Sequence, residues 1–159
     1  MRVTIYNTLL NDNYYPAMFK ESAVNYKAVN LNTPEIIVKM MNDIFKSNMR
    51  SEEYLYELCF TTRMNLIGVF EVSHGSISQT MICEREIFQK ALLCGAASIV
   101  LVHNHPSKDS APSRDDIIIT EHLEDAGKLI GIPIVDHIII GKDFFSFLKE
   151  GIIKKEESV

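Results

Sequence analysis

The sequence predicts an α/β protein in which helices cover both faces of a mixed central β-sheet. Residues Ala97–Val102 are almost all apolar and rich in β-branched side chains, as in a central strand covered on both faces. Two more strand-like runs, Tyr54–Thr61 and Leu66–Val72, are separated by turn-prone residues and indicate an antiparallel pair. Other segments between the strands carry apolar residues at helical spacing, so helices are expected on both sides of the sheet.

The N-terminal elements follow from extended segments and one helix-start signal. Arg2–Leu10 and Tyr26–Leu31 are predicted to be extended. Thr33, Pro34 and Glu35 combine a cap residue, a first-turn proline and an acidic second position, which predicts a helix that ends near residue 47. The apolar residues of this helix recur at helical spacing and are expected to pack on the sheet.

The C-terminal half alternates strands and helices. A short strand is expected at Ile77–Ile82, followed by a helix at Glu84–Cys94 that stops at a glycine. After the strand Ala97–Val102, a helix is predicted at Arg114–Ile130 and an apolar strand at Pro133–Ile140.

Composition favours one globular domain. The 159 residues are 47% hydrophobic and 23% charged, which is enough apolar material for a real core. Within that single domain, residues 1–50 are expected to supply strands and a helix packed on the core, and residues 51–153 the core itself. The charged tail, residues 154–159, is expected to be disordered.

Charge and the lack of targeting signals argue against a dedicated nucleic-acid binder, a secreted protein and a membrane protein. Sixteen basic and 21 acidic residues give a net charge of −5, and no run of Lys and Arg provides the footprint of a dedicated nucleic-acid binder. Three cysteines without paired metal-ligand spacing fit reduced thiols. No signal-peptide pattern or membrane-spanning apolar run is present, so we expect a cytoplasmic protein without a membrane partner.

A candidate zinc site lies in the stretch LVHNHPSKDSAPSRDD. His103 and His105 are two apart at the end of the strand, so they share a face and can converge on one ion. Asp116 follows His105 by eleven positions, in the first turn of a helix that Ser113 would cap. Two imidazoles and one carboxylate leave a fourth zinc position for water, which is typical of catalytic rather than structural sites.

Other polar residues near this stretch have ordinary explanations beside functional ones. His137, next to Asp136, is either a partner that orients a metal-bound histidine or a structural histidine in a buried strand. His74 either lines a substrate cleft or is a turn residue. His122 is expected to be solvated on its helix.

The motif His-x-His, ten residues, then Asp, with Ser113 three positions before that Asp, resembles the JAMM motif of JAB/MPN metalloproteases. The surrounding HNHPS and APSRDD resemble the RadC-like branch. NLIGVFEVSHGSI, REIFQKAL and VDHIIIG resemble further family segments in the family's order, over about the last two thirds of the chain. The resemblance implies the three-layer MPN fold, which is cytidine-deaminase-like.

The resemblance also implies an activity. It implies a zinc-dependent hydrolase of peptide or isopeptide bonds, with Zn²⁺ held by His103, His105 and Asp116. By the family match Glu71 is the catalytic glutamate, which takes a proton from the attacking water and returns it to the leaving nitrogen. Ser113 is expected to cap its helix and to donate to the oxyanion of the reaction intermediate.

Two departures from the family narrow what can be transferred. Longer members of the RadC-like branch look like a helix-hairpin-helix module joined to this unit. We expect no such module here, so the family's DNA-repair label transfers poorly to this chain. Cys83-Glu84 stands where His-Pro is expected, and Lys108 where the family has glycine. The alternatives are an accessory protein of DNA repair, recombination or mobile elements that contacts other proteins, and a zinc-stabilised scaffold without turnover.

Overall fold

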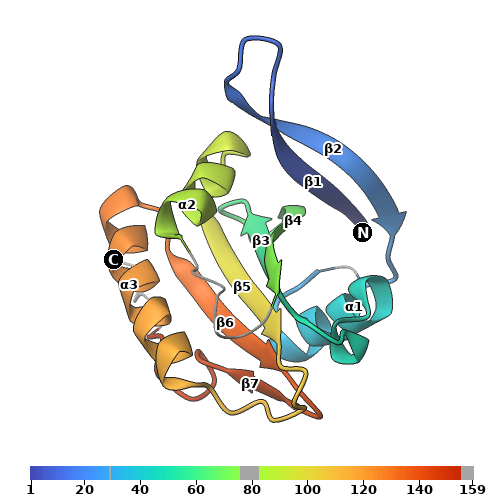
Figure 1. The fold of residues 1–159 in the computed structure, drawn as a ribbon, viewed down its shortest axis with the longest axis vertical. Helices are drawn as coiled ribbons and strands as arrows, with labels where there is room; N and C mark the ends of the chain where they lie inside the picture. The colour runs from blue at the N-terminus through green and yellow to red at the C-terminus, as the bar shows by residue number, and fades with distance from the viewer. Residues whose placement is uncertain (29, 76–82, 155–159) are drawn as a thin grey trace.

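A computed structural model describes residues 1–28, 30–75 and 83–154 (Figure 1). Along these residues the chain forms strands and helices in the order β1 (Arg2–Leu10), β2 (Pro16–Asn25), α1 (Pro34–Phe45), a 3₁₀ turn at Ser47–Met49, β3 (Glu53–Phe60), β4 (Leu66–Gly75), α2 (Glu84–Leu93), β5 (Ser98–Asn104), α3 (Arg114–Ile130), β6 (Ile134–Ile140) and β7 (Phe144–Ser146).

The strands form one mixed sheet in the order β2-β1-β4-β3-β5-β6-β7. β3 pairs antiparallel with both β4 and β5, whereas β1 with β4 and β5 with β6 are parallel pairs. All seven residues of β5 are buried, as its apolar sequence predicts. The predicted antiparallel pair β3–β4 and the central position of β5 are therefore confirmed.

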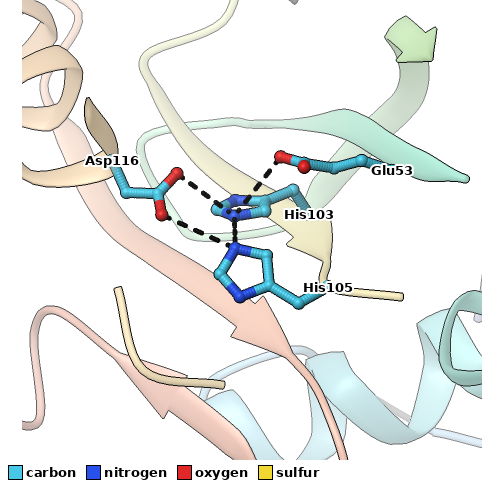
Figure 2. A group of neighbouring side chains, drawn as sticks. All are labelled: Glu53, His103, His105 and Asp116. Atoms are coloured by element: carbon cyan, nitrogen blue, oxygen red, sulfur yellow. Dashed lines mark hydrogen bonds and ion pairs between the residues drawn. The ribbon is translucent and has the colours of Figure 1, made fainter. Parts of the chain in front are cut away.

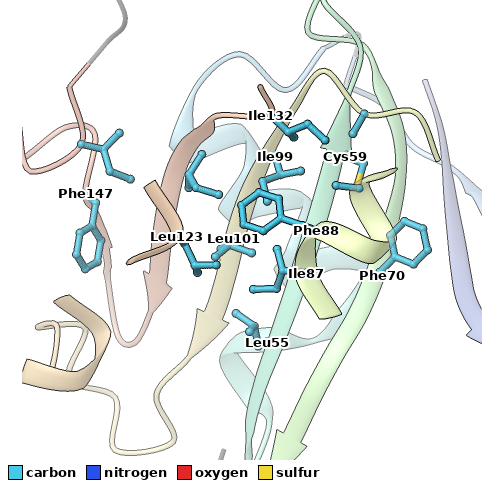
Figure 3. Packing of buried hydrophobic residues seen from close by; sticks show 14 of the residues in the cluster. Leu55, Cys59, Phe70, Ile87, Phe88, Ile99, Leu101, Leu123, Ile132 and Phe147 are labelled. Atoms are coloured by element: carbon cyan, nitrogen blue, oxygen red, sulfur yellow. The ribbon is translucent and has the colours of Figure 1, made fainter. Parts of the chain in front are cut away.

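Two apolar clusters lie on opposite faces of the sheet and define the three layers. On one face, α2 and α3 contribute Ile87, Phe88 and Leu123, which pack with sheet residues such as Leu101 (Figure 3). On the other face, α1 packs its apolar side on a second cluster, whose members include Ile37, Met40, Met41, Phe45, Tyr56, Val69 and Val102. The α/β fold with helices on both faces of a mixed sheet is confirmed.

The N-terminal hairpin differs from the sequence-based prediction. The second strand is Pro16–Asn25, and the described residues of Tyr26–Leu31, which we expected to be extended, form no strand. The side chain of Asn11 explains the early turn, because its Oδ1 accepts hydrogen bonds from the backbone N–H groups of Asn13 (2.9 Å) and Tyr15 (3.1 Å). The chain therefore reverses at once and returns along β1.

The remaining predicted elements lie close to their expected bounds. The helix Arg114–Ile130 has the predicted limits, and Gly131 ends it with a φ of 80°. The short strand β7 was not predicted. The strand expected at Ile77–Ile82 and the tail beyond Lys154 lie outside the described residues. Among the helices that the structure describes, none combines the length and the apolar character needed to cross a membrane.

Glu57 is a buried carboxylate in the middle of β3. Cys59 Sγ donates to Glu57 Oε1 at 3.4 Å, and Glu57 Oε2 has no hydrogen-bond partner among the described residues. Burial raises the pKa of Glu57 from 4.5 to about 8. Because the folded state favours the protonated carboxyl, its contribution to stability is complete below pH 4.5 and is lost as the pH rises through about 8.

We therefore predict that Glu57→Gln flattens the pH dependence of stability. Between pH 4.5 and about 8 the unfolded chain has released the Glu57 proton while the folded chain still holds it. The free energy of unfolding of the wild type should therefore fall by roughly 1.4 kcal/mol per pH unit within that window. Urea unfolding between pH 5 and 8.5 measures this slope. Glu52→Gln, at an exposed position of the same segment, is the control and should keep the wild-type slope. A slope in Glu57→Gln equal to that of the wild type would contradict the prediction.

Candidate metal centre

Four side chains from three parts of the chain meet at one end of the sheet (Figure 2). His103 lies near the end of β5, and His105 follows that strand directly. Asp116 lies in the first turn of α3, and Glu53 is the first residue of β3. Each side chain offers one ligand atom, and all four atoms lie within 4.8 Å of one another. The structure therefore brings together the three predicted ligands and adds one carboxylate.

The distances show that one atom is the centre of this group. His103 Nε2 lies 3.0 Å from His105 Nε2, 3.3 Å from Asp116 Oδ1 and 3.8 Å from Glu53 Oε1. His105 Nε2 lies 3.5 Å from Asp116 Oδ2. Nitrogen and carboxylate oxygen atoms that converge at such distances are a donor set suited to zinc.

Burial and the contacts among His103, His105 and Asp116 shift the pKa values of all three side chains. Burial keeps the pKa of the His103 imidazole well below 6.5, whereas a hydrogen bond with Asp116 raises the pKa of His105. For Asp116, burial alone would raise the pKa, but the hydrogen bonds from His105 and Ser113 outweigh it and hold the pKa well below its usual range. The Asp116 carboxylate is therefore ionised at neutral pH.

Glu53 has a carboxylate oxygen that the described residues leave unsatisfied. Its Oε2 is buried and has no hydrogen-bond partner among the residues described. Burial raises the pKa of Glu53, while the nearby charge of His105 acts to lower it. A buried oxygen without a partner is costly unless a group absent from the protein itself satisfies it. The residues present therefore fit a bound cation with its water.

The ring nitrogen of His103 that faces away from the group contacts a further histidine, His137. His103 Nδ1 lies 2.8 Å from His137 Nε2, and His137 Nδ1 lies 2.7 Å from Thr120 Oγ1. His137 is completely buried, and burial lowers its pKa to about 4. Of the two interpretations of His137, the structure favours the partner that orients a candidate metal ligand.

Ser113 caps α3 in the predicted way. Its Oγ accepts from the Asp116 backbone N–H at 3.1 Å, and Asp116 Oδ2 accepts from the Ser113 backbone N–H at 2.7 Å, which together form a capping box. The Ser113 hydroxyl also donates to Asp116 Oδ2 at 2.6 Å. Asp116 therefore completes the cap of α3 and also faces the candidate metal site.

Glu71 does not join the four-residue group. Its carboxylate is paired with His74 Nδ1 at 2.8 Å, and its side chain is 39% exposed. A bulge in the β3–β4 pairing, where the partner of Leu55 is Ser73 but the partner of Tyr56 is Glu71, leaves Val72 unpaired. Because Tyr56 belongs to the α1-side cluster, Glu71 lies on the sheet face opposite His103.

The sequence contained a weaker signal for Glu53. It occupies the first position of β3, two residues before Leu55, and residues two apart on a strand share a face. Leu55 is paired with His103, so that face carries Glu53 toward the histidines. The pairing joins residues 48 positions apart in sequence, and local patterns do not reveal it.

The loop between the ligands contains an unusual backbone conformation. Lys108 has a φ of 69°, in the left-handed region that favours glycine. Its Nζ donates to the Asn48 carbonyl, and its own carbonyl accepts from Lys142 N–H at 2.7 Å. These contacts hold the loop against the 3₁₀ turn Ser47–Met49 and the residues that follow β6.

Comparison with known proteins gives the same result as the geometry. The RadC-like JAB domain model matches residues 31–152. A UPF0758 protein of Methanococcoides burtonii is 38% identical over 122 residues, which cover 74% of this chain and 53% of that protein. One of Clostridium perfringens is 39% identical over 122 residues, covering 77% and 53%, and one of Methanosarcina mazei is 43% identical over 110 residues, covering 69% and 48%.

The matches cover most of the chain but not its N-terminal residues. The family match begins at residue 31, so the hairpin of β1 and β2 precedes it. The chain spans about half the length of the curated relatives it matches. Because the matched residues include every member of the four-residue group, and the fold and the candidate metal site agree with the match, the chain belongs to the RadC-like JAB domain family.

Proposed function

We propose that this protein is a zinc-dependent hydrolase of peptide or isopeptide bonds, with His103, His105 and Asp116 as metal ligands and Glu53 as the general base. The observation that carries the proposal is the half-buried Glu53 carboxylate, whose buried Oε2 has no partner among the described residues and which lies beside the three proposed ligands. This assignment replaces Glu71, to which the family resemblance in the sequence gives the role of base.

The donor set supports zinc. A zinc ion held by two imidazoles and a carboxylate keeps an open position and, when bound, supplies a water of lowered pKa and polarises a carbonyl oxygen. His103 and His105 present Nε2 to the centre of the group, and Asp116 presents its carboxylate. The ionised Asp116 offsets part of the positive charge that such an ion brings into a buried site.

Glu53 has the chemistry of a proton carrier. Its side chain is largely buried, and burial raises its pKa toward the range in which a carboxylate both accepts and releases a proton near neutral pH. In the proposed reaction, a Glu53 oxygen takes a proton from the attacking water and returns it to the nitrogen of the cleaved amide. One carboxylate therefore serves both half-steps.

Ser113 has a second proposed role, as an oxyanion donor. In the structure its hydroxyl donates to Asp116 Oδ2, so donation to a substrate oxygen requires that the hydroxyl rotates away from this carboxylate. The backbone part of the capping box does not depend on that rotation, because the Ser113 N–H still donates to Asp116. Capping and oxyanion binding are therefore compatible.

The first prediction of the proposed function concerns metal content. The wild-type chain, purified without chelator, should carry about one zinc, as expected for a single three-ligand site, and His105→Ala and Asp116→Ala should lose it. Mass spectrometry of the native protein measures the content. His122→Ala is the control, because His122 is 64% exposed and outside the group, and it should retain zinc. A wild type that takes up no zinc, even when zinc is added, would overturn the proposed function.

The second prediction separates the two glutamates. Glu53→Gln should keep its zinc but lose roughly 10²- to 10⁴-fold in kcat, the usual contribution of a general acid–base. Glu71→Gln should retain nearly all activity, because its carboxylate lies on the other face of the sheet. Cleavage of a peptide and isopeptide library by zinc-loaded protein gives the rates. The opposite pattern would restore Glu71 as the base, and a zinc-loaded wild type that cleaves no substrate would favour the accessory role.

The third prediction concerns Ser113. Ser113→Ala removes the cap hydroxyl and should lower the free energy of unfolding by about 1 kcal/mol. If the hydroxyl also supports the oxyanion, kcat should fall roughly 10²- to 10³-fold while zinc is retained. Ser113→Thr keeps a hydroxyl and serves as the control in both urea unfolding and kinetics. A loss of stability with unchanged kcat would confine Ser113 to the cap.

A further inference from the structure

We propose that Thr120 and His137 are positioning residues that set the tautomer of His103, so that its Nε2 lone pair faces the metal site. This inference rests on the proposed function, because it concerns one of the three proposed ligands. Neither residue belongs to the group of candidate ligands, and neither is exposed to solvent.

Four groups form one continuous chain of contacts. His103 Nδ1 lies 2.8 Å from His137 Nε2, and His137 Nδ1 lies 2.7 Å from Thr120 Oγ1. Thr120 Oγ1 in turn lies 2.5 Å from the backbone carbonyl oxygen of Asp116. Thr120 and His137 are both 0% exposed, so solvent does not compete for these contacts.

The direction of every hydrogen bond follows from the last member. The Asp116 carbonyl can only accept, so the Thr120 hydroxyl must donate its single proton to it. Thr120 Oγ1 must then accept, and His137 carries its proton on Nδ1. The unprotonated Nε2 of His137 accepts in its turn, so His103 must donate from Nδ1. The proton of a neutral His103 is therefore away from the metal site.

The opposite direction would place two acceptors in contact. If Thr120 donated to His137, its oxygen and the Asp116 carbonyl oxygen would face each other at 2.5 Å without a proton between them. His137 would then carry its proton on Nε2, and His103 would carry one on its own Nε2, which would prevent that atom from binding a metal. A single hydroxyl at position 120 therefore decides whether His103 can be a ligand.

Two further contacts fix the planes of the rings. His137 stacks on Phe147, with ring centroids 5.0 Å apart and planes within 13° of parallel. His103 is inclined to His137 by 51° at a centroid distance of 4.9 Å. The series of hydrogen bonds ends on the backbone carbonyl of Asp116. It therefore links the orientation of His103 to the first turn of α3, which carries Asp116.

Imidazole ¹⁵N spectra of the 159-residue chain as purified test the assignment directly, because the protonated and unprotonated nitrogens of a neutral imidazole differ in chemical shift. We expect protonated Nδ1 and unprotonated Nε2 for His137, and protonated Nδ1 for His103. Protonated Nε2 at either histidine in the wild type would overturn the proposal. The wild-type spectrum needs no substitution, so a variant that fails to fold does not affect this result.

Substitution of Thr120 tests the consequence for binding. Thr120→Val keeps the shape but removes the hydroxyl, so His137 loses the acceptor that sets its tautomer; zinc affinity should fall roughly 10- to 100-fold, as for other supporting partners of metal-bound histidines. Thr120→Ser keeps the hydroxyl and should restore both the affinity and the ¹⁵N pattern. Competition with a zinc chelator measures the affinity, and thermal melting checks that both variants are folded.

The outcomes separate this inference from the proposed function. Wild-type affinity and tautomers in a folded Thr120→Val would overturn the inference and leave the hydrolase proposal intact. Zinc binding that weakens in Thr120→Val and recovers in Thr120→Ser supports the inference even if no substrate is cleaved. A wild type that binds no zinc, but shows the expected tautomers, overturns the proposed function and retains the assignment of the two positioning residues.

Discussion

The position of β5 between β3 and β6 is the constraint on which the candidate site depends. All seven residues of β5 are buried, so the strand delivers His103 into a space with little access to water. Polar groups in such a space are costly unless each finds a partner. The histidines, Asp116 and Thr120 meet that requirement with one another, whereas Glu53 Oε2 has no partner among the described residues and is open to a bound cation or its water.

Asp116 shows how a local and a distant requirement are met by one residue. Its backbone N–H and Oδ2 complete the capping box with Ser113, while its carboxylate lies within 3.5 Å of both histidines. The cap holds the first turn of α3 in place, and this turn carries the carbonyl that receives the Thr120 hydroxyl. Folding of the helix end and assembly of the site are therefore coupled.

The two faces of the sheet have different chemistry at the same end of the molecule. The face covered by α2 and α3 carries the four converging side chains, whereas the α1 face carries the exposed Glu71–His74 pair, with His74 stacked on Tyr54. The bulge at Val72 determines this division, because strict alternation from Ser73 would have put Glu71 on the same face as Leu55. One extra residue in β4 thus places Glu71 on the face away from the histidines.

The sequence alone determined the features that depend on neighbours in the chain. The fold class, the limits of α3, its serine cap and the meeting of His103, His105 and Asp116 follow from hydrophobic spacing, helix-end chemistry and short intervals along the chain. The remaining features depend on contacts between segments that are distant in the sequence. Glu53 reaches the site because β3 pairs with β5 across 48 residues, Glu71 is excluded by a bulge, and His137 meets His103 through the parallel β5–β6 pairing. These outcomes depend on strand register, which distant backbone hydrogen bonds set and which local patterns do not encode.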